Sequence, residues 1–452
     1  MTYRALLAGN ADFRRLWAGQ VVSEVGDWLN NIAVLALVIQ FAGAQSVGLA
    51  VAAYALARHL PLFLFGPVAG VVVDRASRRR VMIAADLARA ALALGFLLAN
   101  RAGSLALIYV VGASLFAVSA FFNAAKRAAT PNLVAGTEEL LAANSLSAST
   151  TAATIAVGSA LGGVIATALG RDTVFVLNAL TFLASAALIR RIRKTAGGGR
   201  GAMGAGGEEA ASGSTSGAAA AAASTLAGGR SPLAAYFAEF REGLRYVGRD
   251  RVLRAVLVVA AGWGLGNGAA RALYSIFGAR LGEQAAAGWG ASLPSLAERP
   301  TDFGISVLFV AMGLGGVLGA PLARRFNSGA VEGLGARMGR SLVLDGCGLL
   351  AFSLTPSLFG AAAVLVAREV NFAIWWTAQQ TLLMRRTEDA FAGRVFASYE
   401  TLTTLTMVGS MLVSGAAADR AGIRSVGACA GGVVVASGLT WFVLRRRGAE
   451  AG

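Results

Sequence analysis

The residues most able to do chemistry in this sequence are charged side chains set inside long apolar segments. In the segment 14–41, Glu24, Asp27 and Asn31 follow i, i+3, i+7 spacing, so they share one face of a helix. A charged group at the centre of a membrane costs roughly 2.5–3.5 kcal/mol on insertion scales, so this face should line a polar interior. We interpret Asp27, with Glu24 beside it, as a carboxylate that exchanges a proton or binds a cation. The alternative is a structural network with Arg58 of the next segment.

A second polar set lies in the segment 358–384. Arg368 and Glu369 are adjacent and therefore do not face each other along the helix, and Asn371, Trp375 and Trp376 follow. Buried charge beside paired aromatic rings suits a large amphipathic ligand, and ordinary aromatic packing is the alternative for the tryptophans. Two further candidates for the same cavity stand four residues apart in the segment 252–279: Asn267 and Arg271.

Other kinds of site find little support. His59 is the only histidine, and a lone histidine in an apolar helix is more often hydrogen-bonded packing than a coupling group. Cys347 and Cys429 lie inside apolar segments, where they read as small buried residues rather than a disulfide pair. Neither lysine follows a glycine, so a phosphate loop is absent from the sequence. We expect neither an enzyme nor a metal site nor a bound cofactor.

The elements that carry these residues are membrane-spanning helices. The chain has 452 residues, 56% hydrophobic and 14% charged, with a mean hydropathy of +0.63, which excludes an ordinary soluble globule. A span needs about 20 apolar residues. The sequence predicts an all-α membrane protein with twelve spans: 14–41, 46–73, 81–100, 104–125, 142–169, 172–190, 252–279, 303–323, 337–355, 358–384, 395–418 and 423–444.

The net charge of +16 reports topology rather than nucleic-acid binding. With a cytoplasmic N-terminus, most of the 40 Lys and Arg residues fall in loops on one side, as the positive-inside rule requires. Arginine far outnumbers lysine, which hints at a GC-rich bacterial genome. We therefore expect a multi-pass protein of a bacterial inner membrane, with both termini cytoplasmic and no cleaved signal peptide.

The chain divides into two halves that look like copies. Residues 1–191 and 252–452 each hold six predicted spans, and the stretch from Thr137 to Gly158 resembles the stretch from Thr387 to Gly409. Between the halves, residues 192–231 are rich in Gly, Ala and Ser and read as a flexible cytoplasmic linker. Residues 232–251 follow with helical spacing of apolar residues, which predicts an amphipathic helix along the inner membrane surface.

A family resemblance rests on specific segments. FLFGPVAGVVVDRASRRR at 63–80 resembles the signature loop between helices 2 and 3 of the major facilitator superfamily of transporters. FRRLWAGQVVSEVGDWLNNIAVLALV, FFNAAKRAATPNLVAGTEELLAANSL and EDAFAGRVFASYETLTTL are similar to the branch of siderophore (enterobactin) exporters and macrolide efflux proteins. One departure is Ser159, which stands where antiporter-type members often carry proline.

The resemblance implies roles for particular residues. Asp74 should face the N-terminus of helix 11 near Gly393, in a cytoplasmic gate whose other residues are Gly70, Arg75, Arg78, Arg79, Asp86 and Arg89. Helices 1, 4, 7 and 10 line the central cavity of such transporters. This implication adds Phe122 and Asn123 to the cavity candidates Asn31, Arg58, Asn267, Arg271, Arg368, Glu369, Asn371, Trp375 and Trp376.

The sequence as a whole therefore predicts a major facilitator fold in two six-helix repeats. Its expected activity is proton-coupled export of siderophores, macrolides or other amphipathic small molecules by alternating access. A lipid or lysolipid transporter of the same fold is the alternative. The expected partners are a small-molecule substrate, protons and the lipid bilayer, with no nucleic acid, and the protein is expected to be a monomer.

Overall fold

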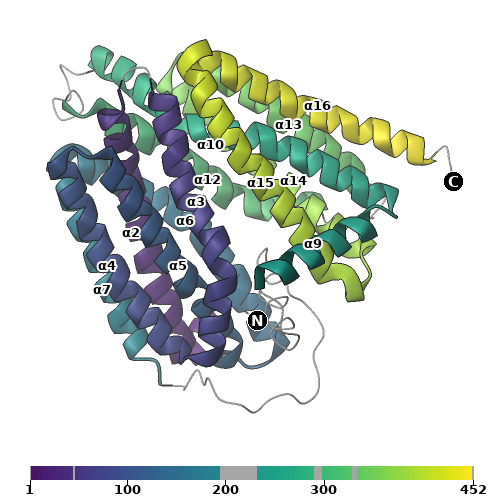
Figure 1. Cartoon of the computed structure of the whole chain (residues 1–452), viewed down its shortest axis with the longest axis horizontal. Helices are drawn as coiled ribbons and strands as arrows, with labels where there is room; N and C mark the ends of the chain where they lie inside the picture. Colours follow the sequence, from purple (N-terminus) through teal and green to yellow (C-terminus); the bar gives the residue numbers. More distant parts are fainter. Residues whose placement is uncertain (1, 44–45, 194–231, 290–297, 328–332, 450–452) are drawn as a thin grey trace.

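The structure is a computed structural model in which every regular element of the described residues is a helix (Figure 1). It describes residues 2–43, 46–193, 232–289, 298–327 and 333–449. The predicted linker at 192–231 lies almost wholly outside them. The helices are α1 (Tyr3–Gly9), α2 (Ala11–Phe41), α3 (Val47–Arg75), α4 (Arg78–Ala102), α5 (Leu105–Leu133), α6 (Gly136–Leu169), α7 (Arg171–Arg190), α9 (Pro232–Val247), α10 (Arg251–Trp289), α12 (Pro300–Asn327), α13 (Leu334–Leu354), α14 (Leu358–Arg386), α15 (Asp389–Ala421) and α16 (Ile423–Ala449).

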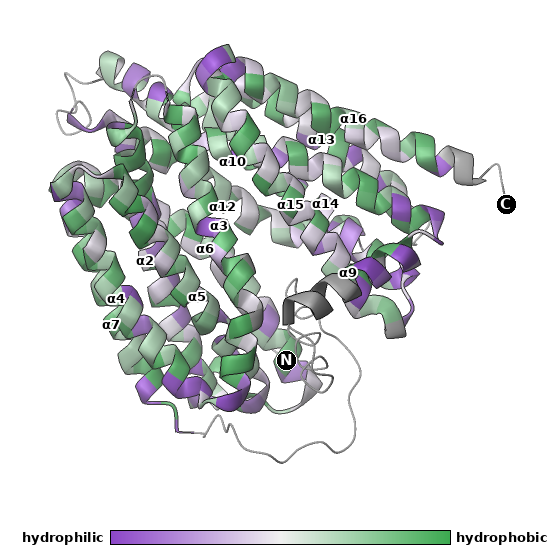
Figure 2. Ribbon diagram, viewed as in Figure 1, coloured by the Kyte–Doolittle hydropathy of each residue, from purple (hydrophilic) through white to green (hydrophobic). Residues whose placement is uncertain are grey.

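Each predicted span coincides with one long helix, which confirms the predicted fold class. Eleven helices of the described chain are long and apolar enough to cross a membrane. The twelfth, α13, has 21 residues but carries Arg337, Arg340 and Asp345. Figure 2 shows apolar residues along the helices and hydrophilic residues gathered toward their ends. Several helices outrun the predicted spans, because backbone hydrogen bonding continues through polar residues beyond the apolar stretch.

The two halves repeat one packing scheme. In the first half, α2 packs on α6 and α7, and α4 packs on α5 and α7. In the second half, α10 packs on α15 and α16, and α13 packs on α14 and α16, which are the equivalent pairs. Two further pairs, α3 with α5 and α12 with α14, complete the match. The resemblance between the halves that the sequence indicates is therefore repeated in their tertiary contacts.

Glycines let helices approach closely in both halves, but the glycines that do so are on α6 in the first half and on α10 in the second. A Cβ on Gly158 or Gly162 of α6 would lie 2.7 Å and 2.8 Å from backbone oxygens of α2. In the second half the equivalent Gly409 has open space around it. There Gly268 of α10 makes the close approach, because its Cβ would lie 2.3 Å from the backbone oxygen of Met407.

The two halves join at one end, which is the upper end in Figure 1. Here α3 meets α15, where a Cβ on Gly48 would lie 2.3 Å from the backbone oxygen of Gly415. Asp419 of α15 accepts hydrogen bonds from the backbone N–H groups of Gly48 and Leu49, at 2.7 and 3.0 Å. The helices of the two halves diverge toward the lower end (Figure 1).

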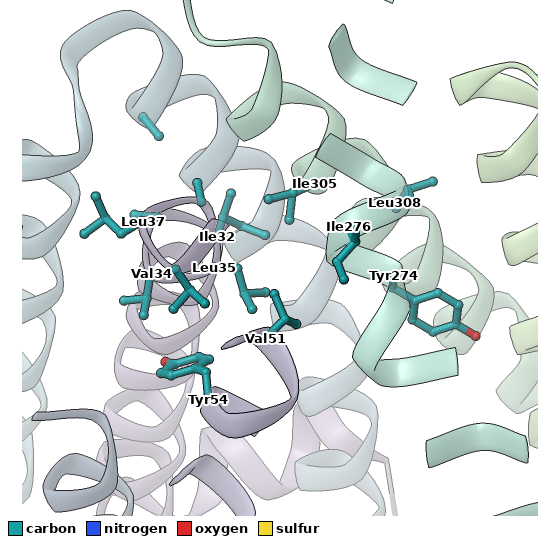
Figure 3. Packing of buried hydrophobic residues seen from close by; sticks show 14 of the residues in the cluster. Ile32, Val34, Leu35, Leu37, Val51, Tyr54, Tyr274, Ile276, Ile305 and Leu308 are labelled. Carbon is teal, nitrogen blue, oxygen red and sulfur yellow. The ribbon is translucent and has the colours of Figure 1, made fainter. Parts of the chain in front are cut away.

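The core follows the same division. One cluster of buried apolar side chains joins both halves near the upper end: Ile32, Leu35, Val51, Tyr54, Ile276, Ile305 and Leu308 belong to it (Figure 3). Two other clusters stay within single halves.

The two cysteines differ from expectation, since Cys347 and Cys429 are exposed on α13 and α16. A small apolar residue is as stable against lipid as in a core, so burial does not follow from the apolar sequence around it.

The amphipathic helix predicted at 232–251 appears as α9, which ends at Val247. Gly248 closes it, and the Asp250 carboxylate then caps α10 by accepting from the N–H groups of Val252 and Leu253, at 2.7 and 2.9 Å. The described part of α9 packs against α15, where Ser398 donates a hydrogen bond to the backbone oxygen of Phe240 at 3.0 Å. Its placement on a membrane surface stays a prediction.

Candidate functional site

The predicted polar face of α2 carries three side chains with three different partners. Asp27 lies 3.8 Å from the Arg89 guanidinium of α4. Asn31 accepts a short hydrogen bond from Arg58 of α3. The network that the sequence offered as an alternative therefore exists, but it connects Arg58 to Asn31 and adds Arg89 as the direct ion-pair partner of Asp27. The Asp27 side chain keeps 28% of its surface exposed although it lies in the middle of a long helix.

Glu24 lies in a polar cluster of its own. One of its carboxylate oxygens lies 3.5 Å from the ammonium of Lys126 and accepts from Gln20 at 2.8 Å. The other oxygen accepts from the hydroxyls of Thr151 and Thr154, both at 3.2 Å. Sequence reasoning missed Lys126 because the predicted span ends at residue 125, whereas α5 continues to Leu133. The rarity of lysine in this chain is the signal that could have found it.

Arg89 of α4 is buried and contacts several polar and aromatic side chains of the first half. It pairs at short range with Asp86, which is fully buried, and it lies between the rings of Phe122 and Phe182, 4.1 and 4.4 Å from their centres. Cation–π contacts of this kind compensate part of the cost of burying a guanidinium. Phe122 is therefore packed beneath Arg89 and is itself buried, whereas Asn123 beside it is half-buried.

A second buried ion pair organises the other half. The Arg368 guanidinium lies 3.0 Å from Asp345 of α13 and donates to Asn267 of α10 at 3.2 Å. It also donates a short hydrogen bond to the hydroxyl of Tyr274. Asp345 and Tyr274 were not candidates, because nothing in the local spacing links them to Arg368. Arg368 and Asn267 are thus engaged with the protein itself and are both buried.

The aromatic residues of α14 pack into a cluster of rings. Trp375 stacks on Trp263 of α10 with ring centres 4.7 Å apart, and its side chain is 1% exposed. Trp376 is half-buried and lies 6.2 Å from the Tyr399 ring. Asn371 donates to the backbone oxygen of Ser341 at 2.7 Å. The packing alternative therefore describes Trp375, and Trp376 keeps an accessible ring surface.

Two charged side chains of the second half remain accessible. Arg271 of α10 is exposed, and Glu369 of α14 is half-buried. Helix α10, which carries Arg271, also packs against α2 and α3 of the first half. The second half thus keeps accessible charge of both signs, on α10 and on α14. His59, next to Arg58, bonds through Nδ1 to the backbone oxygen of Ala55 at 2.8 Å, as a packed histidine does.

The predicted gate residues lie at the lower end of the first half. Arg78 donates to the backbone oxygen of Ala128 at 2.9 Å, and Arg79 donates to that of Ile192 at 2.7 Å. Asp74 and Arg75 are exposed. A Cβ on Gly70 would meet nothing within 4 Å beyond the adjacent residues of its own helix, and the same holds for Gly393 of α15. In this conformation the gate loop and the start of α15 are apart, while Asp86 and Arg89 belong to the Asp27 network.

The comparisons with known proteins fit this architecture. Residues 6–200 match an MFS family model described as "Transmembrane secretion effector". Macrolide efflux protein A of Streptococcus pyogenes is 36% identical over 126 residues, which cover 27% of this chain and 30% of that protein. The putative bacilysin exporter BacE of Bacillus amyloliquefaciens is 30% identical over 179 residues, 39% of this chain and 42% of that protein. The chain thus matches less than half the length of these relatives.

Solved structures show the same fold over nearly the whole chain. A bacterial homologue of the human lysosomal transporter Spinster, inward-facing and unoccupied, superposes with a TM-score of 0.63 at 13% identity, covering 96% of this chain and 97% of that one. The nucleoside transporter NupG gives 0.64 at 10% identity, covering 95% and 99%. The first part of the chain is thus similar in sequence to an MFS family model, and the chain as a whole shares the fold of these solved transporters. Over the matched residues the chain resembles the macrolide efflux protein and the putative bacilysin exporter.

Proposed function

We propose that the protein is a secondary active transporter that exports amphipathic small molecules in exchange for protons, by alternating access. The observation that carries the proposal is Asp27, a partly accessible carboxylate 3.8 Å from Arg89 in the middle of α2. Burial favours the neutral form of a carboxylate, and a nearby guanidinium favours its charged form. Asp27 and Arg89 belong to the same half, so rearrangement of the halves changes the exposure of Asp27 to water and to the second half rather than its distance to Arg89. The balance then shifts, and a proton can be taken up in one state and released in the other.

The proposed cargo follows from the side chains that stay accessible. Arg271 and Glu369 offer charges of both signs, and Trp376 offers an aromatic face. A ligand with separate polar groups and an apolar body would satisfy all three, as amphipathic natural products do. Relatives named for macrolide efflux and bacilysin export support this class of cargo.

The proposed topology places the lower end of Figure 1 in the cytoplasm. Helix α4 begins and α7 ends at this end, and both helix ends carry arginines, in agreement with the positive-inside rule. The conformation is then inward-facing, as the Spinster homologue is described. We keep the proposed division into two six-helix halves, 1–191 and 252–452, a linker at 192–231 and the amphipathic segment 232–251, in a monomer of the bacterial inner membrane with both termini cytoplasmic.

Transport in proteoliposomes tests the proposal. Asp27→Asn keeps the size and hydrogen bonding of the side chain but cannot titrate. With a labelled macrolide such as erythromycin as the probe, we expect concentrative uptake driven by a proton gradient to collapse, while exchange without a gradient continues. Asp172→Asn is the matched control, because Asp172 stands at the start of α7 and accepts a hydrogen bond from Asn100 of α4, whereas Asp27 lies in the middle of α2.

Three outcomes would change the assignment. If Asp27→Asn still concentrates the probe against a gradient, coupling lies elsewhere, and Glu24 with Lys126 becomes the next candidate. If the purified protein moves labelled lysolipid but produces no substrate-stimulated proton flux, the lipid-transporter alternative replaces the export of drug-like compounds. If the control variant loses coupling as well, the loss reports instability rather than the chemistry of Asp27.

A further inference from the structure

A concentration of arginines lies at the lower end of the first half, at a distance from the Asp27 network. The side chains surround a pocket of about 440 Å³ and come from three helices that are far apart in the sequence. Its lining residues are Arg15 of α2, Arg79 of α4, and Arg190, Arg191, Ile192 and Arg193 at the end of α7. Figure 2 shows the hydrophilic colouring of this end of α4 and α7.

Positive charge in the pocket is only partly balanced. Arg15 pairs with Asp12 at 2.6 Å, and the same carboxylate accepts from the backbone N–H of Arg193 at 3.1 Å. Among the described residues, Arg190 and Arg191 have no ion-pair partner and are both exposed. A neighbouring pocket contains Asp12 and Glu139, and Glu139 is engaged with the backbone N–H of Ala135 at 2.8 Å. Five guanidiniums thus line one pocket beside a single paired carboxylate.

Two of the guanidiniums are already fixed in place. Arg79 is held by its hydrogen bond to the backbone oxygen of Ile192, and Arg15 is held by Asp12. Held guanidiniums lose less freedom when they bind an anion, and their planar donors match the oxygens of a phosphate group in pairs. The positive-inside rule explains why arginines are on this side of the protein, but it does not require arginines of α2, α4 and α7 to converge on one pocket.

We propose that this pocket binds a phosphate-bearing anion. Its size suits a phosphorylated headgroup, and Arg190 and Arg191 stand in the last turn of a membrane-spanning helix, at the depth of lipid headgroups. The phosphate can belong to an anionic phospholipid of the adjacent leaflet or to a soluble phosphate compound. Either anion would bridge the end of α7 to the starts of α2 and α4. The inference does not depend on the transported substrate.

Binding to the purified full-length protein tests the proposal. Native mass spectrometry and thermal unfolding would compare phosphatidylglycerol with phosphatidylcholine, and inorganic phosphate and pyrophosphate with chloride at equal ionic strength. The variant Arg190→Gln/Arg191→Gln removes two exposed charges from the pocket. The matched control is Arg385→Gln/Arg386→Gln, an exposed arginine pair in the last turn of α14 in the other half.

We expect the unmodified protein and the control to bind one of the phosphate probes, and the pocket variant to bind it about tenfold more weakly. Binding of phosphatidylglycerol that inorganic phosphate does not displace identifies a lipid headgroup, and binding of phosphate or pyrophosphate alone identifies a soluble anion. The proposal is overturned if no phosphate probe binds more tightly than its neutral or chloride counterpart, or if the two double variants lose binding equally.

Discussion

The ion pair that joins the two halves at their closed end offers the sharpest test of alternating access. Arg171, at the start of α7, donates through Nε to both oxygens of Asp302 at 3.0 and 3.1 Å, and through Nη2 at 2.8 Å. Asp302 belongs to α12 of the other half and is 0% exposed, whereas the Arg171 side chain is 15% exposed. Arg171 also donates a short hydrogen bond to Gln40. This pair must break when the upper end opens.

The magnitude follows from that geometry. Removing one partner of a buried ion pair typically costs about 3–5 kcal/mol. Asp302→Asn is milder, because the amide oxygen still accepts one hydrogen bond and Arg171 retains Gln40 and some solvent. We expect the substitution to destabilise the conformation seen here by about 2 kcal/mol. It should destabilise the conformation that is open at the upper end much less, because the pair is already broken there. The ratio of the two populations should then shift about 30-fold toward the second state.

Distances between spin labels in nanodiscs would measure the shift, with both native cysteines replaced by serine. One label pair, at Arg101 and Leu354, reports the upper ends of α4 and α13. A second pair, at Arg80 and Met384, reports the lower ends of α4 and α14; all four positions are exposed. Asp302→Asn should lengthen the upper distances and shorten the lower ones.

The control is Asp172→Asn, which removes a carboxylate at the same end of the protein but from a hydrogen bond inside one half. If Asp302→Asn and Asp172→Asn give the same distance distributions, the pair between the halves does not hold this conformation, and the reasoning from its geometry is refuted. A change at the upper end without a change at the lower end would show that the halves do not move as two units.

Three further predictions concern packing, charge and the gate. Gly162→Leu should lower thermal stability by about 1–3 kcal/mol, because a Cβ there meets a backbone oxygen of α2 at 2.8 Å, whereas Gly432→Leu, with open space around it, should unfold normally. Asp345→Asn should cost about 3 kcal/mol in thermal unfolding, because it leaves the buried Arg368 charge without its carboxylate partner. Asp345→Asn/Arg368→Met should recover part of that loss, and no recovery would contradict the pairing. Asp74→Ala should reduce transport while substrate binding persists, since Asp74 is exposed here and its expected contact belongs to the other state; normal transport would contradict the gate assignment.

Helix positions and short-range pairs could be predicted from the sequence because their causes are local. Apolar segments of sufficient length predicted all twelve long helices. The i, i+3 spacing of Asp86 and Arg89 puts both on one helix face, where the structure pairs them. The shared face of Glu24, Asp27 and Asn31 is likewise a property of one helix.

The partners of these residues were decided only by tertiary structure. Arg89 rather than Arg58 pairs with Asp27, and Asp345 reaches Arg368 from a neighbouring helix. The pair of Arg171 and Asp302 joins residues 131 apart in the chain. Such contacts depend on how helices dock and on which of two conformations the halves adopt, and no local period encodes either. The sequence alone thus determined which charges lie within the membrane-spanning helices, because their placement depends on composition and spacing. Docking determined which charges neutralise one another, because Coulomb energy and hydrogen bonding act over a few ångströms in space, whatever the separation along the chain.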